Sequence, residues 1–285
     1  MAALDRLDSR AADRIAALCR RALERPPSAD ELRACLWAPD QPAIVRGDPD
    51  VGVVATVPGA APPPEDPTAR CGSLRLLVVD PARQGQGLGT ELLHVAERDL
   101  IGQGGSVVIT VGADPPYYLF PGVETTQLAM LCLLERNHYN RVDATYNMDV
   151  DLADVPPPTP GPVVAGPGDR DDVAAFITAH WPFWEGEVMR ALAKGTLAIE
   201  RDGSGVAAFC AWDVNRRGIV GPVGVRVELI GKGRGLAVLL LALDRLRADG
   251  WARVEVGWVG PVVPYARVGG TVGRVFFVYR KTVTA

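Results

Sequence analysis

The amino-acid sequence predicts two α/β domains in tandem, built on one repeated arrangement of strands and helices. Three observations lead to this prediction. A glycine-rich loop at residues 79–89 separates an apolar run from an amphipathic run. The same glycine spacing returns in the second half of the chain, at residues 231–235. Between the two copies lies a stretch rich in proline and glycine, residues 154–168, whose composition opposes both helix and sheet.

The first glycine loop follows the apolar run Leu74–Val79 and precedes the amphipathic run Leu88–Leu100. These two runs predict a strand and a helix. Glycine has no Cβ, so backbone N–H groups in such a loop can turn toward a ligand that comes close. The N-terminal end of the following helix adds a partial positive charge. The stretch therefore predicts an anion site suited to a phosphate or a pyrophosphate.

Two common phosphate-binding motifs do not fit this loop. A Walker A loop ends in Gly-Lys followed by Ser or Thr, and no such pair follows here. A dinucleotide-binding fingerprint needs the spacing G-x-G-x-x-G, whereas these glycines alternate. The stretch instead resembles the acyl-CoA loop of the GNAT superfamily of N-acetyltransferases. That family's pattern, (Gln/Arg)-x-x-Gly-x-(Gly/Ala), is matched by Gln84, Gly87 and Gly89.

The order of the predicted elements is also that of GNAT domains, in each half of the chain. The first half gives helices from residues 8 and 28, strands at 43–45 and 51–57, strand 74–79, helix 88–100, strand 106–111, helix 127–136 and strand 142–150. The second half gives a helix from residue 169, a hairpin at 197–212, strand 219–225, helix 236–247, strand 251–258, a short helix at 261–267 and a final strand at 272–280.

A constant offset relates the two loops and supports an internal repeat. Matching residues, each 146 positions apart, are Val79 and Val225, Gly85 and Gly231, Gly87 and Gly233, and Gly89 and Gly235. We therefore expect an N-terminal GNAT domain at 1–153, a linker at 154–168 and a C-terminal GNAT domain at 169–285. The resemblance implies that each domain is a mixed, mainly antiparallel sheet flanked by helices. It also implies central strands that splay apart after Val79 and after Val225.

The resemblance implies acetyl-CoA as the acyl donor, bound by the strand end and the glycine loop. In the first half the expected cofactor-binding residues are Leu77, Val78, Val79, Gln84, Gly85, Gln86, Gly87, Leu88, Gly89 and Thr90. In the second half they are Val223, Val225, Gly231, Lys232, Gly233, Arg234, Gly235 and Leu236. A backbone N–H of the preceding strand, near 77–79 or 223–225, is expected to polarise the thioester carbonyl.

GNAT enzymes often use a tyrosine on the short helix after the fifth strand to protonate the departing thiolate. Tyr265 matches that position in the second half, whereas Leu134 stands there in the first half and cannot donate a proton. We therefore expect the second domain to carry the chemistry, with Tyr265 as the acid. Packing is the alternative role for this side chain. Tyr139 matches a core aromatic of the family.

The second half departs from the family pattern in its loop. Ile230 stands where Arg or Gln is usual, and Lys232 and Arg234 offer compensating charge for phosphate. A general base is not evident, because Glu255 fits an outward strand residue or an ion pair as well as a base. His180 and the aromatic residues 181–184 fit either an acceptor site or core packing.

Composition excludes several functional classes. The net charge of −4 gives no field that favours nucleic acid, and no run of apolar residues is long enough to cross a membrane. The five scattered cysteines and the absence of a signal-peptide pattern at the start lead us to expect a cytoplasmic protein. No histidine has a second ligand at metal-binding spacing, so no metal site is expected. The sequence does not predict the oligomeric state.

Two functions from different classes follow. The first is an acetyl-CoA-dependent N-acetyltransferase that acts on a primary amine of a small molecule. The second is a non-catalytic acyl-CoA-binding or interaction protein built from degenerate GNAT domains. Tyr265 favours the first function, and Leu134, Ile230 and the missing base favour the second.

Overall fold

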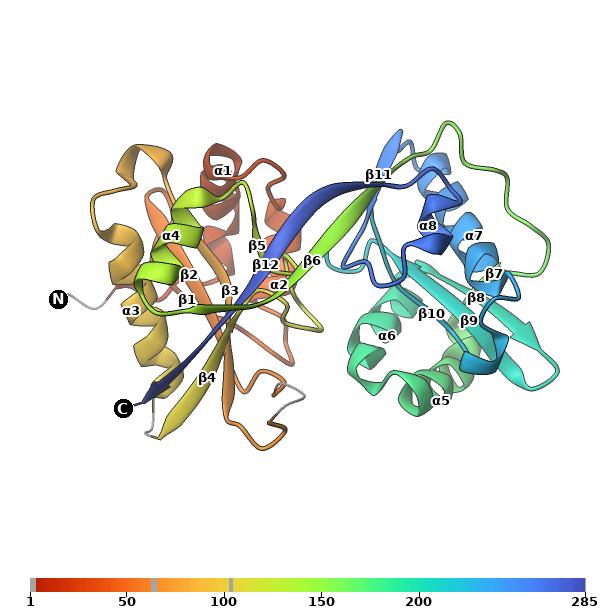
Figure 1. Cartoon of the computed structure of the whole chain (residues 1–285), viewed down its shortest axis with the longest axis horizontal. Coiled ribbons are helices and arrows are strands. Elements are labelled where there is room, and N and C mark those ends of the chain that lie inside the picture. The colour runs from red at the N-terminus through yellow and green to blue at the C-terminus, as the bar shows by residue number, and fades with distance from the viewer. Residues whose placement is uncertain (1–3, 63–65, 103–104, 285) are drawn as a thin grey trace. The chain divides into compact units, whose positions relative to one another are not determined.

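The computed structural model describes residues 4–62, 66–102 and 105–284 and divides the chain into two compact units (Figure 1). The first unit contains the chain up to Thr145 together with the residues from Val275 on. The second unit runs from Tyr146 to Arg274.

The first unit is a mixed sheet with helices on both faces. Its elements are α1 (Ala12–Ala22), α2 (Ala29–Leu36), β1 (Ile44–Asp48), β2 (Gly52–Pro58), β3 (Cys71–Val79), α3 (Leu88–Ile101), β4 (Ser106–Val111), β5 (Val123–Glu124), α4 (Leu128–Arg136), the start of β6 (Asn140–Asp151) and the end of β12 (Thr271–Thr284). The strands from β1 to β3 pair antiparallel, β3 and β4 pair parallel, and β4 and β12 pair antiparallel. The predicted mixed, mainly antiparallel sheet is therefore confirmed.

Apolar side chains on the two faces of this sheet form two cores. Ile15 and Leu18 of α1 and Leu32 of α2 pack against one face. Leu92 of α3 and Leu134 of α4 pack against the other face. Local sequence also sets one helix start: Ser28 and Glu31 form a capping box, in which each side chain accepts a bond from the other's backbone N–H.

The second unit repeats this plan. Its elements are β7 (Val163–Val164), α5 (Arg170–His180), α6 (Glu185–Lys194), β8 (Leu197–Asp202), β9 (Gly205–Trp212), β10 (Ile219–Val225), α7 (Arg234–Ala248), β11 (Arg253–Val256) and α8 (Val263–Ala266). Within this unit, Figure 1 shows α5 and α6 on one side of the sheet and α7 and α8 on the other. The strand β10 pairs antiparallel with β9 and parallel with β11, as β3 does with β2 and β4.

The two glycine loops have the same backbone conformation, which confirms the repeat at the structural level. Gly87 caps α3 with φ 88° and ψ −12°, and Gly233 caps α7 with φ 83° and ψ −8°. Gly85 and Gly231 have φ values of 73° and 83°. Both are left-handed conformations, which L side chains adopt only with strain. The glycine spacing in the sequence thus reflects a backbone requirement that is met twice.

The units differ from the predicted domain boundaries because two strands change unit partway along. β6 passes from the first unit to the second at residue 146, and β12 passes back at residue 275. Arg253–Val256 of β11 pairs with 148–151 of β6, and Ser106–Val111 of β4 pairs with 279–284 of β12. The predicted domain boundaries at residues 153 and 169 do not account for the change of unit by either β6 or β12. In addition, Val163–Val164, in the predicted linker, forms β7 and pairs with β8.

Side chains at the end of the chain also anchor the helices of the first unit. The hydroxyl of Tyr279 donates a hydrogen bond to Oε1 of Glu135 on α4, at 2.8 Å. The Nζ of Lys281 donates to Oε1 of Glu97 on α3, at 2.7 Å. The last strand therefore supports both helices that follow the glycine loop of the first unit.

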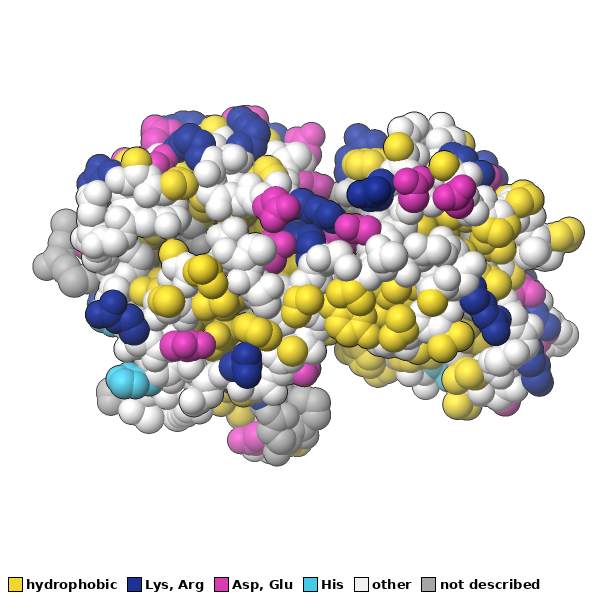
Figure 2. Space-filling view, turned by 45° about the horizontal axis from the view of Figure 1, so that its top comes forward, with side chains coloured by type: hydrophobic (Ala, Val, Ile, Leu, Met, Phe, Trp, Pro, Cys, Tyr) yellow, Lys and Arg dark blue, Asp and Glu magenta, His cyan; other side chains and the backbone are white. Residues whose placement is uncertain are grey.

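The surface carries charges of both signs. On the face in Figure 2, Lys and Arg side chains lie among Asp and Glu side chains, and apolar side chains are exposed on both units. Within the described ranges no helix has the length and hydropathy needed to cross a membrane. The same residues hold no group of three or more His, Cys, Asp or Glu side chains arranged to bind a metal ion.

The buried position of Phe276 generates a stability prediction. Its side chain, in the last strand, is fully buried, whereas Phe183 of the second unit is 60% exposed. We expect Phe276→Ala to lower the free energy of unfolding by about 3–5 kcal/mol, because it opens a cavity in the core. The matched control Phe183→Ala should change it by no more than about 0.5 kcal/mol. Urea denaturation of both variants tests this, and equal losses would contradict the placement of the last strand.

Candidate functional site

The site begins where two parallel strands of the first unit separate. Pairing between β3 and β4 covers Cys71–Leu74 opposite 108–111. The chain leaves the sheet at Gly112 and returns at Gly122, and a Cβ built on Gly112 would lie 2.7 Å from the Cα of Gly122. β5 then continues the line of β4 beside β12. The splay was predicted after Val79, but it starts after Leu74, because the excursion at 112–122 removes the partner strand earlier.

The separated part of β3 presents backbone N–H groups on its free side. The N–H of Asp80 donates to the carbonyl of Val51 at 2.9 Å, so Asp80 bonds toward β2. Backbone N–H groups along a strand alternate between its two sides. The N–H groups of Leu77 and Val79 therefore point away from β2, into the opening. The side chain of Gln84 confirms this direction, since its Nε2 donates to the carbonyl of Val79 at 3.2 Å. Leu77 and Val79 therefore offer two N–H donors to a ligand in the opening.

The glycine loop adds a second set of N–H donors at the end of the same strand. Asp80 accepts from the backbone N–H of Ala82 and pairs with Arg21, and these contacts lower the pKa of its carboxyl group. The N–H of Gln84 donates to the carbonyl of Pro81 at 3.4 Å, and the next backbone bond, at 3.1 Å, runs from Glu91 to Gly87. The N–H groups of residues 85–90, between these bonds, lie at the positive end of α3.

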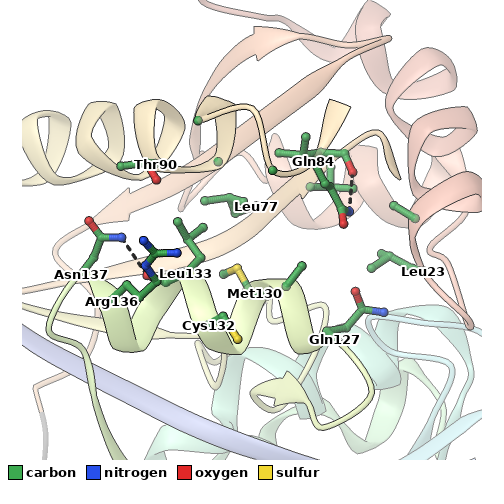
Figure 3. A pocket seen from close by; sticks show the side chains of 17 residues that line it. Leu23, Leu77, Gln84, Thr90, Gln127, Met130, Cys132, Leu133, Arg136 and Asn137 are labelled. Atoms are coloured by element: carbon green, nitrogen blue, oxygen red, sulfur yellow. Dashed lines mark hydrogen bonds between the residues drawn. The ribbon is translucent and has the colours of Figure 1, made fainter. Parts of the chain in front are cut away.

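A cavity of about 580 Å³ joins these two sets of donors (Figure 3). In Figure 3 the strand and loop residues Leu77, Gln84 and Thr90 lie on one side of it, and Met130 and Leu133 of α4 lie on the other. The full lining is Ala22, Leu23, Leu77, Val78, Val79, Gln84, Gly85, Gly87, Gly89, Thr90, Gln127, Ala129, Met130, Cys132, Leu133, Arg136 and Asn137.

Most of the residues predicted for the first loop meet in this cavity, and two point elsewhere. Leu77, Val78, Val79, Gln84, Gly85, Gly87, Gly89 and Thr90 line it. The Nε2 of Gln86 donates to the carbonyl of Ala82 at 3.1 Å, and Leu88 packs against the core beneath α3. These two side chains stabilise the loop rather than face the cavity.

Sequence reasoning missed the α4 wall and the end of α1. Arg136 contributes a cation to the lining, and the amide of Asn137 donates to the carbonyl of Leu133 at 2.7 Å. The spacing of Met130, Leu133 and Asn137, which places them on one helix face, is the signal that could have identified this wall. Nothing in the local pattern of Ala22 and Leu23 indicates that α1 ends at the cavity.

The second loop differs from the first in its side chains. The Nη1 of Arg234 donates to Oε1 of Glu200 at 2.8 Å, so the charge proposed for a phosphate is engaged in an ion pair within the unit. Lys232 is exposed, and Ile230 is 66% exposed and cannot make the bond that Gln84 makes. The backbone of the loop is repeated, but its polar side-chain contacts are not.

The slot of the second unit also opens earlier than predicted. Pairing between β10 and β11 ends at Val220 opposite Val256, five residues before the predicted position at Val225. The N–H of Arg226 donates to the carbonyl of Ala207 at 2.9 Å. By the same alternation, Val223 and Val225 point away from β9, toward the opening.

Tyr265 lies among core side chains of the second unit. It is 7% exposed and belongs to the core cluster that contains Cys210 and Val238. Burial raises the pKa of the phenol, so it stays protonated at neutral pH. In the first unit, Leu134 is fully buried, and Tyr139 is buried in the same core.

The other candidate side chains have partners within the second unit. Glu255 is buried and accepts from the Nη1 of Arg274 at 3.2 Å and from the amide of Asn147, which favours the ion-pair interpretation over a base. Trp181 stacks on Trp184 with ring centroids 5.9 Å apart. The ring centroids of His180 and Trp181 lie 5.5 Å apart, so this group is a packed aromatic cluster with exposed edges.

Comparisons with known proteins agree with this geometry. Residues 11–116 match the model of the acetyltransferase (GNAT) family. A GCN5-related glucosamine N-acetyltransferase region of a fungal multi-domain GH3 β-N-acetylglucosaminidase is 22% identical with a TM-score of 0.77, over 98% of this chain and 38% of that one. This chain thus spans well under half of the fungal protein's length. A search of curated proteins found no match.

Two further structures match over nearly their whole length. A GCN5-related N-acetyltransferase from Sphaerobacter thermophilus is 19% identical with a TM-score of 0.67, over 99% of this chain and 96% of that one. A tandem GNAT protein from the clavulanic acid biosynthesis pathway is 16% identical with a TM-score of 0.66, over 98% of each chain.

Residues 11–116 therefore match the acetyltransferase (GNAT) family, and the whole chain shares its fold with these GNAT structures, one of them a tandem GNAT protein. Acyl transfer is the chemistry of this family.

Proposed function

We propose that this protein is an acetyl-CoA-dependent N-acetyltransferase that transfers an acetyl group to a primary amine of a small molecule. The observation that carries the proposal is the cavity of the first unit, which brings the loop donors at 85–90 and the strand donors at Leu77 and Val79 to one space. A ligand with an anionic head and a carbonyl at the end of an extended arm fits this arrangement of donors.

The residues of the cavity fit acetyl-CoA in chemistry as well as in shape. The N–H groups of residues 85–90 suit a pyrophosphate, and Arg136 adds a cation to the lining. The apolar side chains of Leu23, Leu77 and Met130 suit an arm with little charge. Bound acetyl-CoA would supply an activated thioester at the end of that arm.

The chain's own contribution to the reaction is positioning and electrostatic stabilisation. The N–H of Leu77 or Val79 in the first unit, or of Val223 or Val225 in the second unit, donates to the thioester oxygen of an acetyl-CoA bound in that unit as negative charge develops on it. The amine nitrogen forms the new bond to the acyl carbon, the carbon–sulfur bond breaks, and the sulfur leaves as thiolate. The amine loses a proton and the thiolate gains one, and a positioned acid accelerates the second transfer.

Tyr265 remains the proposed acid for an acetyl-CoA bound in the slot of the second unit, and its side chain packs in the core of that unit. Burial raises the pKa of its phenol, so the side chain carries its proton at neutral pH. The proposal thus gives the two units unequal tasks. The first unit has the more complete binding loop for acetyl-CoA, and the second unit, with Val223, Val225 and the loop at 231–236, would bind the acetyl-CoA whose thiolate Tyr265 protonates.

A second candidate function, non-catalytic acyl-CoA binding, is favoured by one observation. The lining of the first-unit cavity contains no carboxylate, histidine or tyrosine among the residues that the structure describes. Cys132 and Arg136 are its titratable side chains. Release of free CoA thiol from acetyl-CoA in the presence of an amine library separates the two functions.

The acceptor is proposed as a small amine on the basis of the resemblance to the GNAT acetyltransferase family. One of the similar structures is described as a glucosamine N-acetyltransferase region, and at 22% identity it supports the fold rather than the substrate. An amine library that includes amino sugars, amino acids and polyamines therefore suits the assay.

Matched substitutions in the two loops test where acetyl-CoA binds. Gly87 and Gly233 have nearly equal φ values, and a Cβ built on either meets no atom within 4 Å. Valine at either position imposes the same backbone strain, so the melting temperatures of the two variants should decrease by similar amounts. We expect Gly87→Val to weaken acetyl-CoA binding by about 10- to 100-fold, because it fills the space of the phosphate and disturbs its N–H donors.

The control Gly233→Val should leave that affinity unchanged and lower turnover instead. Isothermal titration calorimetry measures the affinity, and thiol release measures the turnover. Unchanged affinity in Gly87→Val with lost affinity in Gly233→Val would move the main binding site to the second unit.

Tyr265→Phe tests the proposed acid, because it keeps the ring and its packing and removes the proton donor. We expect kcat to fall by about 10²- to 10⁴-fold, the usual contribution of a general acid, with acetyl-CoA affinity nearly constant. The comparison requires an unchanged melting temperature. Wild-type turnover in this variant would assign Tyr265 to packing.

A further inference from the structure

One residue of β3 breaks the regular alternation of the strand just before the opening. Thr56 of β2 lies opposite Leu74, and the next residue back, Ala55, lies opposite Leu76. Arg75 is thus the extra residue of a β-bulge. It follows directly on Leu74, whose carbonyl accepts from the N–H of Gly112 at 3.1 Å, the last bond before the two strands separate.

The bulge reverses which side of the strand each later residue faces. Leu74 packs in the core beneath α3, whereas Leu76 and Val78 pack in the core beneath α1 and α2. In a regular strand these three side chains would share one face. The N–H groups shift with the side chains. Without the bulge, the N–H groups of Leu76 and Val78 would point into the opening. With the bulge, the N–H groups of Leu77 and Val79 point into it instead.

The side chain of Arg75 fastens this bulge to three other segments. It is fully buried, and its Nε donates to Oδ2 of Asp114 at 2.7 Å. Its Nη1 donates to the carbonyl of Cys35 at the end of α2, at 2.5 Å. Its Nη2 donates to Oε1 of Gln41 in the connection to β1, at 2.8 Å. A single guanidinium therefore joins the bulge, the excursion at 112–122 and the α2 end.

Asp114 places a buried charge at the base of the excursion. Its side chain is 1% exposed, and burial raises the pKa of the carboxyl group while the Arg75 guanidinium opposes that rise. Breaking one partner of such a pair leaves the other charge buried and uncompensated. The pair therefore fixes the excursion that opens the slot.

The repeat offers an internal comparison at the same position. Arg75 corresponds, at the offset of 146, to Gly221, and the second unit also has a bulge there, between Val220 and Val223. Gly221 has φ 132°, a backbone conformation open to glycine. In the second unit a glycine with a backbone conformation that other residues rarely adopt thus forms part of the bulge, whereas in the first unit a buried ion pair holds the bulge in place.

We propose that Arg75, held by Asp114, is the positioning residue that turns the N–H groups of Leu77 and Val79 toward the acyl carbonyl in the first-unit slot. This inference rests on the proposed function, because it concerns acetyl-CoA bound in that cavity. Arg75 acts through the strand and not by contact with the ligand. Its loss should therefore affect the part of acetyl-CoA that those N–H groups contact.

The test compares acetyl-CoA with free CoA, which lacks the acyl carbonyl. The double variant Arg75→Met/Asp114→Leu replaces the ion pair by apolar side chains of similar size and leaves no unpaired charge. The matched control Arg46→Met/Asp99→Leu removes another Arg–Asp pair of the first unit, between β1 and α3, away from the bulge. Calorimetry gives the dissociation constant of each nucleotide for each protein.

We expect the double variant to lose about three- to tenfold in affinity for acetyl-CoA, the worth of one hydrogen bond, with affinity for free CoA unchanged. The control should keep the wild-type preference. Equal weakening of acetyl-CoA and free CoA binding would show that the ion pair only maintains the fold. An unchanged preference for acetyl-CoA over free CoA would show that the ion pair does not orient the N–H groups. Either result overturns the inference.

Arg75→Lys keeps the charge opposite Asp114 and removes the fork of donors, and it decides the question by the same criteria if the double variant does not fold. If the wild-type protein binds neither nucleotide, the proposed function fails and the inference fails with it. If the wild type prefers acetyl-CoA and the Arg75 variants keep that preference, the inference alone fails.

Discussion

The site depends on backbone hydrogen bonds that the sheet leaves open. A strand inside a sheet normally pairs on both sides, and an N–H group without a partner is costly when it is buried. In the first unit β4 departs after Val111, so β3 keeps its bonds to β2 and frees its other side. The cavity lies along that free side and continues to the start of α3. In the proposed function, acetyl-CoA binding and carbonyl polarisation therefore rest on the same feature, a gap in the sheet.

The two units keep that gap by different means, which explains how their sequences diverge while the backbone repeats. The bulge contains Arg75 in one unit and Gly221 in the other. The loop is tied to the strand by Gln84 in one unit, whereas Ile230 is exposed in the other. Glycines whose φ lies in the left-handed region recur in both. Backbone geometry is retained, and side-chain support is free to vary.

Features set by local backbone requirements could be predicted from the sequence, and features set by distant pairing could not. The glycine spacing predicts both loops, apolar runs predict most strands near them, and apolar residues three or four positions apart predict the helices. Helix α6 was not predicted, although Val188, Ala191 and Leu192 form an apolar face at helical spacing. The bulge at Arg75 and the change of unit by β6 and β12 follow from register with segments far away in the chain. The α4 wall was missed because only the fold brings α4 opposite β3.

Amide hydrogen exchange with and without acetyl-CoA tests the central claim most directly, since it reports on the N–H groups themselves. Binding in the first-unit slot predicts slower exchange at residues 85–90 and at Leu77 and Val79, with residues 231–236 changed less at acetyl-CoA concentrations that fill only the tighter site. Protection confined to 231–236 and Val223–Val225, or no protection at either loop, would contradict the assignment of the first-unit cavity as the acetyl-CoA site.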